Sequence, residues 1–338
     1  MVTRRARFAL IAATFAFLTF VPPSLQAEAV PSAQIFVDTS LDADNKGVRV
    51  IDGTTVGGIR LRLDSSKNDA LKGSFQATID STKKTTLDRA YFKARFPWFV
   101  EDTSLRFTAG LAPLSWGKGF LFNAGDPVFG VIPTVDALSA GDYRTATDWM
   151  GLLYLPVGTF SFAELVCLPP VSTRRSRSGG RFVLTPDFGF LQSVETGYLF
   201  EEGPVHKGYV AMDGSLFFDW YAAGSVFDGE YAISFGLFRL FDFIPNLPLS
   251  LRTEGLVYPQ KNVQYWYPSL TAGLTDELEF GVQGYAQTGD DNNLTAGLVT
   301  SLSPLKGFTL SASAMKRFEK GEAVQPDILI KIGCVCSF

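Results

Sequence analysis

The sequence has 338 residues, with 30 Lys and Arg against 34 Asp and Glu, a formal net charge of −4, and one His. This acidic balance gives no support for nucleic-acid binding. Hydrophobic residues make up 46% of the chain, including 30 Phe, yet beyond the N-terminal region no apolar run approaches the ~18 residues that a membrane-spanning helix needs.

The N-terminal residues have the pattern of a secretory signal peptide. Arg4, Arg5 and Arg7 precede an apolar run of about a dozen residues, which is too short to span a membrane. Prolines and small residues follow, and the sequence 27–29 fits an A-x-A cleavage site. We therefore expect residues 1–27 to be removed on export, with a cut at 29 as the alternative. An exported, Phe- and Gly-rich chain without helical runs indicates either a large secreted β-protein or a transmembrane β-barrel.

Residues that could carry catalysis or bind a cofactor are few. The single histidine, His206, has no recognisable nucleophile motif beside it, so we expect no enzymatic activity. The sequence contains no phosphate-binding loop, no dinucleotide fingerprint and no Cys/His metal spacing, so we expect no cofactor and no metal. Three cysteines, Cys167, Cys334 and Cys336, are too few for a disulfide scaffold, and we interpret Cys334 and Cys336, which would share one strand face, as small apolar residues.

Segments of about ten residues with period-2 alternation recur along the rest of the chain. One face of each is mostly Leu, Ile, Val, Phe, Ala or Gly, and the other carries charged, hydroxyl and small residues. The clear segments are 55–64, 87–96, 104–111, 215–224, 249–258, 277–287, 293–302 and 307–316. Strict alternation at this length is typical of transmembrane β-barrels. We predict an all-β fold with a single transmembrane antiparallel barrel over 28–338, of about 16–18 strands, with 14 as an alternative.

The connections between these segments predict two different rims. Longer ones are 38–53, 113–147, 169–180, 259–267 and 319–326, and tight ones are 156–158, 186–187, 213–214, 275–276 and 303–306. Long loops on one side and short turns on the other are typical of such barrels. Aromatic clusters at 96–99, 241–243 and 265–267 suit two interfacial girdles.

The chain ends on a strand-like segment with one continuous apolar face. Its members are Ile330, Ile332, Cys334, Cys336 and the terminal Phe338. With the signal peptide and the alternating segments, this pattern resembles the Gram-negative-type outer-membrane β-barrels, specifically the porins. The resemblance implies an outer-membrane location, with lipids and the barrel-assembly machinery as partners, and it makes Phe338 the assembly signal. The outward faces do not separate a subunit contact from lipid-facing surface.

The segment 113–147 is far longer than an ordinary connection, and its many aromatic residues argue against disorder. Its stretch "PLSWGKGFLFNAGDPVF" resembles a Trp-Gly-x-Gly…Asn-x-x-Asp pattern of some substrate-transporting barrels. It is the third connection on the long side, and in many porins that loop folds into the barrel. The resemblance implies a constriction, for which the candidates are Trp116, Lys118, Phe120, Asn123 and Asp126. An external cap or partner-binding loop is the alternative.

Alternation also assigns side chains to the interior. If the apolar face of each strand meets lipid, the opposite face lines the lumen. The candidate basic residues are Arg60, Arg62, Arg89, Lys93, Arg95 and Arg106, and the candidate acidic residues are Asp219, Glu230, Glu254, Glu277 and Glu279. Opposite charges on facing walls would create a transverse field in a watery pore. The alternative is that these charges pair with one another and plug a narrow barrel.

These features predict a passive diffusion channel for small hydrophilic solutes with a charge-tuned lumen. The first alternative is a surface-exposed barrel that acts as an adhesin or binding protein. The second is a transporter of hydrophobic compounds, but such a barrel needs an N-terminal plug, and only about 25 residues lie between the expected cleavage site and Thr54.

Overall fold

The computed structural model describes residues 29–43, 50–65, 70–98, 103–130, 146–171, 175–186, 188–203, 205–242, 244, 247–289, 293–319 and 328–338. The expected signal peptide lies outside these residues. Within them, no helix is long and apolar enough to cross a membrane. The described strands are β1 (Ala29–Ala43), β2 (Val50–Ser65), β3 (Leu71–Asp80), β4 (Thr85–Pro97), β5 (Ser104–Pro113), β6 (Thr147–Gly158), β7 (Ser161–Leu168), β8 (Arg177–Leu184), β9 (Ser193–Glu201), β10 (Val205–Ser215), β11 (Asp219–Phe227), β12 (Glu230–Phe241), β13 (Leu249–Tyr258), β14 (Val263–Gly273), β15 (Leu278–Thr288), β16 (Asn293–Leu305), β17 (Phe308–Glu319) and β18 (Ile328–Ser337).

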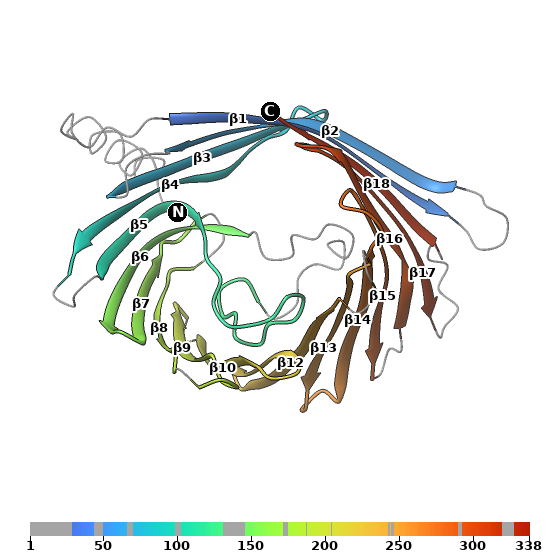
Figure 1. Ribbon diagram of the computed structural model, residues 1–338. Coiled ribbons are helices and arrows are strands. Elements are labelled where there is room, and N and C mark those ends of the chain that lie inside the picture. Colours follow the sequence, from blue (N-terminus) through green and yellow to red (C-terminus); the bar gives the residue numbers. More distant parts are fainter. Residues whose placement is uncertain are drawn as a thin grey trace.

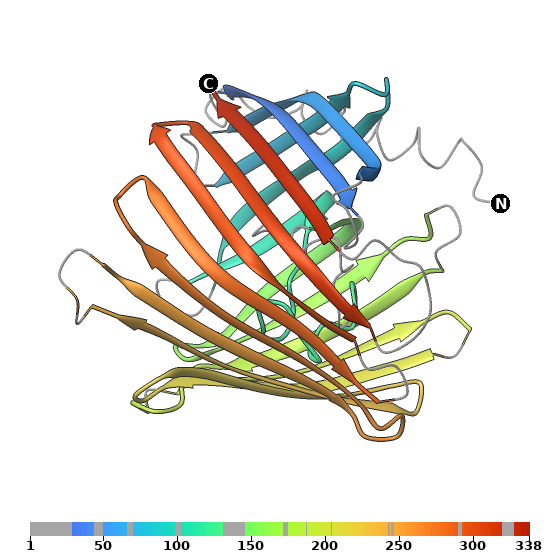
Figure 2. The same ribbon diagram turned by 90° about the vertical axis from the view of Figure 1, so that its right-hand side faces the viewer.

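The strands form one closed antiparallel sheet, in which each pairs with its neighbours in sequence (Figure 1). β1 closes the ring because it pairs with both β2 and β18, which lie side by side with it in Figure 2. Closure includes the terminal residue: Phe338 N donates to Ala33 O at 2.8 Å, and Ala33 N donates to Phe338 O at 3.2 Å. A closed sheet leaves no unpaired edge in lipid. The predicted all-β barrel is therefore confirmed with 18 strands, the upper end of the predicted range, and the alternative of 14 is wrong.

The outer face of the barrel is apolar. Ile59, Leu61 and Leu63 alternate along β2, and about half of each side chain is exposed. Ile332 on β18 is also 45% exposed, and Phe338 is 73% exposed. An exterior on which every second residue is apolar suits contact with acyl chains rather than water.

The two rims differ less than the sequence predicted. We call the end that carries the 114–146 connection the loop rim, and the end that carries Phe338 the terminal rim. Apart from that one connection, eight residues separate β7 from β8 at the loop rim, and eight separate β8 from β9 at the terminal rim. The predicted long connection at 38–53 is wrong, because β1 and β2 extend to leave only 44–49 between them.

The predicted tight turn at 213–214 is also wrong, since both residues lie within β10. Asp213 forms an ion pair with Lys118, whose Nζ lies 3.0 Å from Asp213 Oδ1. A Cβ at Gly214 would lie 1.9 Å from the carbonyl oxygen of Phe190, so this position needs glycine for close backbone approach. Although Asp-Gly is a common turn sequence, these two residues lie inside the strand, and the chain reverses direction at 216–218 instead.

Candidate functional site: the loop inside the barrel and the walls around it

The segment 114–130, which follows β5, lies within the ring of strands (Figure 1). Its apolar side chains are buried, with Trp116 and Phe122 at 0% exposure and Leu121 at 2%. They form one hydrophobic cluster with wall residues that include Leu199 and Leu256. This connection is the third on the loop rim. The remainder of the predicted loop, residues 131–145, lies outside the described residues.

A buried carboxylate on β13 holds the middle of the segment. Glu254 is 2% exposed and accepts hydrogen bonds from three consecutive backbone amides. Phe120 N donates to Oε1 at 3.2 Å, while Leu121 N and Phe122 N donate to Oε2 at 2.8 and 3.0 Å. Consecutive amides that converge on one anion form a nest, and hydrogen bonds to a charged acceptor are the stronger kind. These three hydrogen bonds thus hold the loop backbone against the barrel wall.

A second anchor on β7–β9 holds the start of the segment. Arg181 lies between two carboxylates, with Nε 2.7 Å from Glu164 Oε2 and Nη1 3.0 Å from Glu195 Oε1. Each carboxylate also contacts the loop: Trp116 Nε1 donates to Glu164 at 3.3 Å, and Gly117 N donates to Glu195 at 2.8 Å. Gly117 has φ +72°, and a Cβ there would lie 2.6 Å from the Gly125 backbone, so glycine is required.

Further contacts extend this attachment across the same wall. Ala124 N donates to Ser234 Oγ on β12 at 2.9 Å. On β11, Tyr221 OH donates to Phe122 O at 3.1 Å. Arg177 on β8 pairs with Asp148 and donates to Val128 O at 2.9 Å. The anchors therefore run from β7 to β13.

The five predicted constriction residues have different roles in this segment. Asn123 and Asp126 are buried and organise the loop itself: Asn123 Nδ2 donates to Trp116 O at 2.7 Å, and Asp126 accepts from two later amides. Trp116 packs against the wall. Lys118 pairs with Asp213 at 3.0 Å, and the Phe120 ring centroid lies 3.7 Å from the Arg252 guanidinium carbon. These five residues thus contribute to packing, to hydrogen bonds within the loop and to contacts with the barrel wall.

The predicted bases share strand faces opposite the exposed apolar residues. Arg60 Nη1 donates to Gln34 Oε1 at 3.1 Å, and Arg62 pairs with Asp64. On β4 and β5, Arg95 and Arg106 are direct cross-strand partners. Lys93 is the partner of Lys72 on β3, a base that the sequence analysis did not select. Within the described part of the chain, none of Arg89, Lys93, Arg95 and Arg106 forms an ion pair.

The predicted acids are not brought together into a wall that faces these bases. Glu254 is buried beneath the loop, and Glu230 is an exposed residue at the loop rim whose carboxylate lies 2.8 Å from Lys261 Nζ. Glu277 lies in the turn before β15 rather than on the strand. Asp219 is the first residue of β11 and Glu279 the second of β15, so both lie near the terminal rim. The five carboxylates are therefore apart from one another, because one of them holds the loop and the others lie at or near strand ends.

Alternation divides the aromatic run 265–267 between the two faces of β14, so Trp266 is the member on the outer face. Trp266 is 38% exposed and its ring contacts Phe235, whereas Tyr267 is buried and donates to Gln283 Oε1 at 3.0 Å. The ring centroid of Tyr265 lies 6.2 Å from that of Phe122 in the loop. The interior therefore has an aromatic wall on β13–β15 that the sequence analysis missed.

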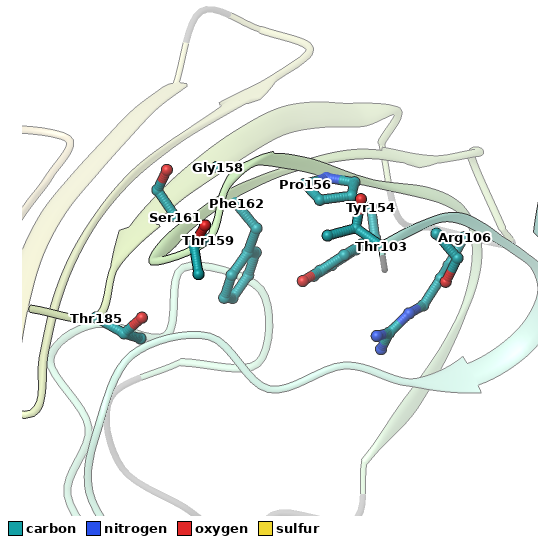
Figure 3. A pocket seen from close by; sticks show the side chains of 10 residues that line it. Thr103, Arg106, Tyr154, Pro156, Gly158, Thr159, Ser161, Phe162 and Thr185 are labelled. Carbon is teal, nitrogen blue, oxygen red and sulfur yellow. The ribbon is translucent and has the colours of Figure 1, made fainter. Parts of the chain in front are cut away.

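A small cavity lies between the β6–β7 turn and β5 (Figure 3). It has a volume of about 250 Å³ and is lined by Arg106, Tyr154 and Phe162 together with hydroxyl side chains. The Arg106 guanidinium carbon lies 4.6 Å from the Tyr154 ring centroid. In the described residues, no group of three or more His, Cys, Asp or Glu is placed to hold a metal.

No protein-family model matches the sequence, and no curated protein matches it. Solved structures do match, and two are OccD3 (OpdP) and OccK11 (OpdR) of Pseudomonas aeruginosa. OccD3 has a TM-score of 0.57 and 10% identity over 95% of this chain and 97% of its own; OccK11 has 0.61 and 11% over 92% and 96%. The fold is that of an outer-membrane β-barrel.

A third similar structure is Wzi of Escherichia coli, described as an outer membrane protein involved in group 1 capsule assembly and as a carbohydrate-binding β-barrel. Its TM-score is 0.64, at 11% identity over 100% of this chain and 90% of its own. The barrel thus resembles both the Occ/OprD porins and Wzi in architecture.

Proposed function

We propose that this barrel is a passive diffusion channel for small hydrophilic solutes, in which the segment 114–130 narrows the lumen and a basic sector tunes charge selectivity. The basic sector consists of Arg60, Arg62, Lys72, Arg89, Lys93, Arg95 and Arg106 on β2–β5. We further infer that the chain is exported by its signal peptide and assembled through Phe338.

The observation that carries this proposal is the one-sided attachment of the loop. Its anchors come from β7–β13, through Glu164, Arg177, Glu195, Ser234 and Glu254. The basic sector lies on other strands, β2–β5, and supplies none of these anchors. A loop fastened to one wall narrows a barrel without having to fill it.

Charge supports the same proposal. An Arg or Lys that faces lipid at the membrane midplane costs about 2–4 kcal/mol, so seven bases on the lipid face would cost about 14–28 kcal/mol, comparable to or above the stability of an ordinary domain. A watery interior avoids that cost. Within the described residues, Lys93, Arg95 and Arg106 form no ion pair with a carboxylate, and such bases favour anions over cations in a pore.

The test is a reversal potential measured across a planar bilayer in a salt gradient. Replacing Arg89, Lys93 and Arg95 with Gln should shift the reversal potential toward cation selectivity and leave folding intact. Lys261→Gln is the matched control, because Lys261 is an exposed base at the loop rim that is already paired with Glu230. An unchanged reversal potential in the triple variant would show that these bases do not face the conducting path.

A second candidate is a surface binding barrel, which the similarity to Wzi favours. In that case the loop would close the lumen and the external connections would bind the ligand. Folded protein that inserts into bilayers without conducting would support this candidate against the channel.

A further inference from the structure

We propose that three tyrosines on β13–β15 form a binding site for the ring of a neutral sugar. The tyrosine site consists of Tyr258, Tyr265 and Tyr285, and Phe122 of the loop packs against the last two. This inference rests on the proposed function, because it names a class of solute that the channel would bind on its way through.

The rings form one connected group. The ring centroid of Tyr265 lies 6.1 Å from those of both Tyr258 and Tyr285, and the first of these pairs is edge-on. Phe122 lies 6.2 Å from Tyr265 and 6.2 Å from Tyr285. Tyr258 and Tyr265 are only partly buried. They therefore present accessible ring surface, and the apolar C–H face of a sugar ring can pack against such a surface.

The hydroxyl groups of these three tyrosines differ in their hydrogen bonding from those of three tyrosines that pack inside the barrel. Tyr209, Tyr221 and Tyr267 each donate a hydrogen bond to a protein group, namely Glu195, the Phe122 carbonyl and Gln283. Among the described residues, no partner receives or donates a hydrogen bond at the hydroxyls of the tyrosine site. Tyr285 is 8% exposed and backs the other two rings, so the hydroxyls of Tyr258 and Tyr265 are the ones that can serve a ligand with several hydroxyl groups of its own.

The surroundings favour a neutral ligand over an ion. Gln287 is the cross-strand partner of both Tyr265 and Asn293, and Thr295 is the partner of Tyr285. Lys261 Nζ lies 5.6 Å from the Tyr258 ring centroid and is paired with Glu230, and Arg317 is the cross-strand partner of Thr295. Amides and hydroxyls beside aromatic rings match a sugar, whereas a purely apolar ligand would leave these polar groups without partners. An anion would prefer the basic sector.

The loop positions this site through its own anchor. The buried Phe122 ring packs against Tyr265 and Tyr285, and its backbone amide donates to Glu254 at 3.0 Å. Release of the loop should therefore remove one ring contact from both Tyr265 and Tyr285, and sugar binding should weaken when Glu254 is replaced although Glu254 does not belong to the site.

The experiment uses the refolded full-length mature chain and maltohexaose, a neutral glucose hexamer, as the probe. Saturable block of single-channel current should occur, and isothermal titration in detergent micelles should give the same dissociation constant. Tyr258→Leu and Tyr265→Leu should each raise that constant at least about fivefold, and the Phe variants should raise it less because they keep the ring. Tyr231→Leu, which changes an exposed tyrosine of the outer face, is the control.

The outcomes separate this inference from the proposed function. A conducting channel that maltohexaose neither blocks nor binds overturns the tyrosine site and leaves the channel standing. Absence of conductance overturns the channel, and titration in micelles then decides the site alone. If a Leu variant loses the heat-modifiable folded form, the dissociation constants of the Phe variants, which keep the ring and lack the hydroxyl, test the site instead. Block by benzoate but not by maltohexaose would point to a flat anion and contradict the sugar.

Discussion

Removing the Glu254 carboxylate should release the segment 114–130 from the wall. Glu254→Ala leaves the amides of Phe120, Leu121 and Phe122 without their acceptor in a buried site. A hydrogen bond to a charged group contributes about 1.5–3 kcal/mol, and loss of a buried charged partner typically costs about 3–5 kcal/mol. A change of that size shifts the attached-to-released ratio of the loop by at least about 100-fold.

Single-channel conductance and limited proteolysis measure this release directly. Glu254→Ala should give higher conductance with more current noise, and it should expose the 114–130 segment to cleavage while the barrel stays heat-modifiable. Glu254→Gln keeps one carbonyl acceptor at similar volume. Its conductance and its rate of loop cleavage should therefore lie between those of Glu254→Ala and those of the unaltered chain. Glu279→Gln is the matched control, because Glu279 is a carboxylate of β15 that does not hold the loop.

One result would refute this reasoning. If Glu254→Ala conducts as the unaltered chain does, and its loop remains protected from protease, then the three amide bonds do not hold the segment. The hydrophobic cluster around Trp116 and Phe122 would then be the dominant attachment.

Three further predictions concern stability, assembly and register. Arg181→Met leaves two buried carboxylates without their shared base and should destabilise the barrel by about 3–5 kcal/mol in urea unfolding, whereas an unchanged midpoint would contradict the ion-pair anchor. Deletion of Phe338 should lower the folded fraction in outer membranes, and equal assembly would remove this reason for the terminal aromatic. In a cysteine-free background, Phe92→Cys should react with lipid-soluble thiol reagents and Lys93→Cys with aqueous ones; the reverse pattern would shift every interior assignment by one residue.

The strands could be predicted because their signal is local. Alternation over ten residues sets which face of β2 or β18 meets lipid, and the closing pairs made by Phe338 need only the last strand and the first. The loop anchors could not be predicted in this way, because Phe122 and Glu254 are 132 positions apart. Without that contact, Glu254 looked like any other interior acid.

For other residues, strand alternation in the sequence already indicated the position that the structure shows. Glu164 lies between Ala163 and Leu165 in a strand whose alternation already places it on the inner face. The run 265–267 looked like one aromatic cluster, although strict alternation divides Tyr265 from Trp266. Asp213 and Gly214 have turn chemistry, and only the contacts to Lys118 and Phe190 explain why they lie in a strand.

The most direct test of the channel is planar-bilayer conductance of the purified, refolded mature chain. The structure predicts stepwise, stable single-channel currents that favour anions in a salt gradient, because the basic sector supplies none of the polar anchors that hold the loop. Heat-modifiable protein that inserts into the bilayer and carries no current would contradict the channel and leave a binding barrel as the function.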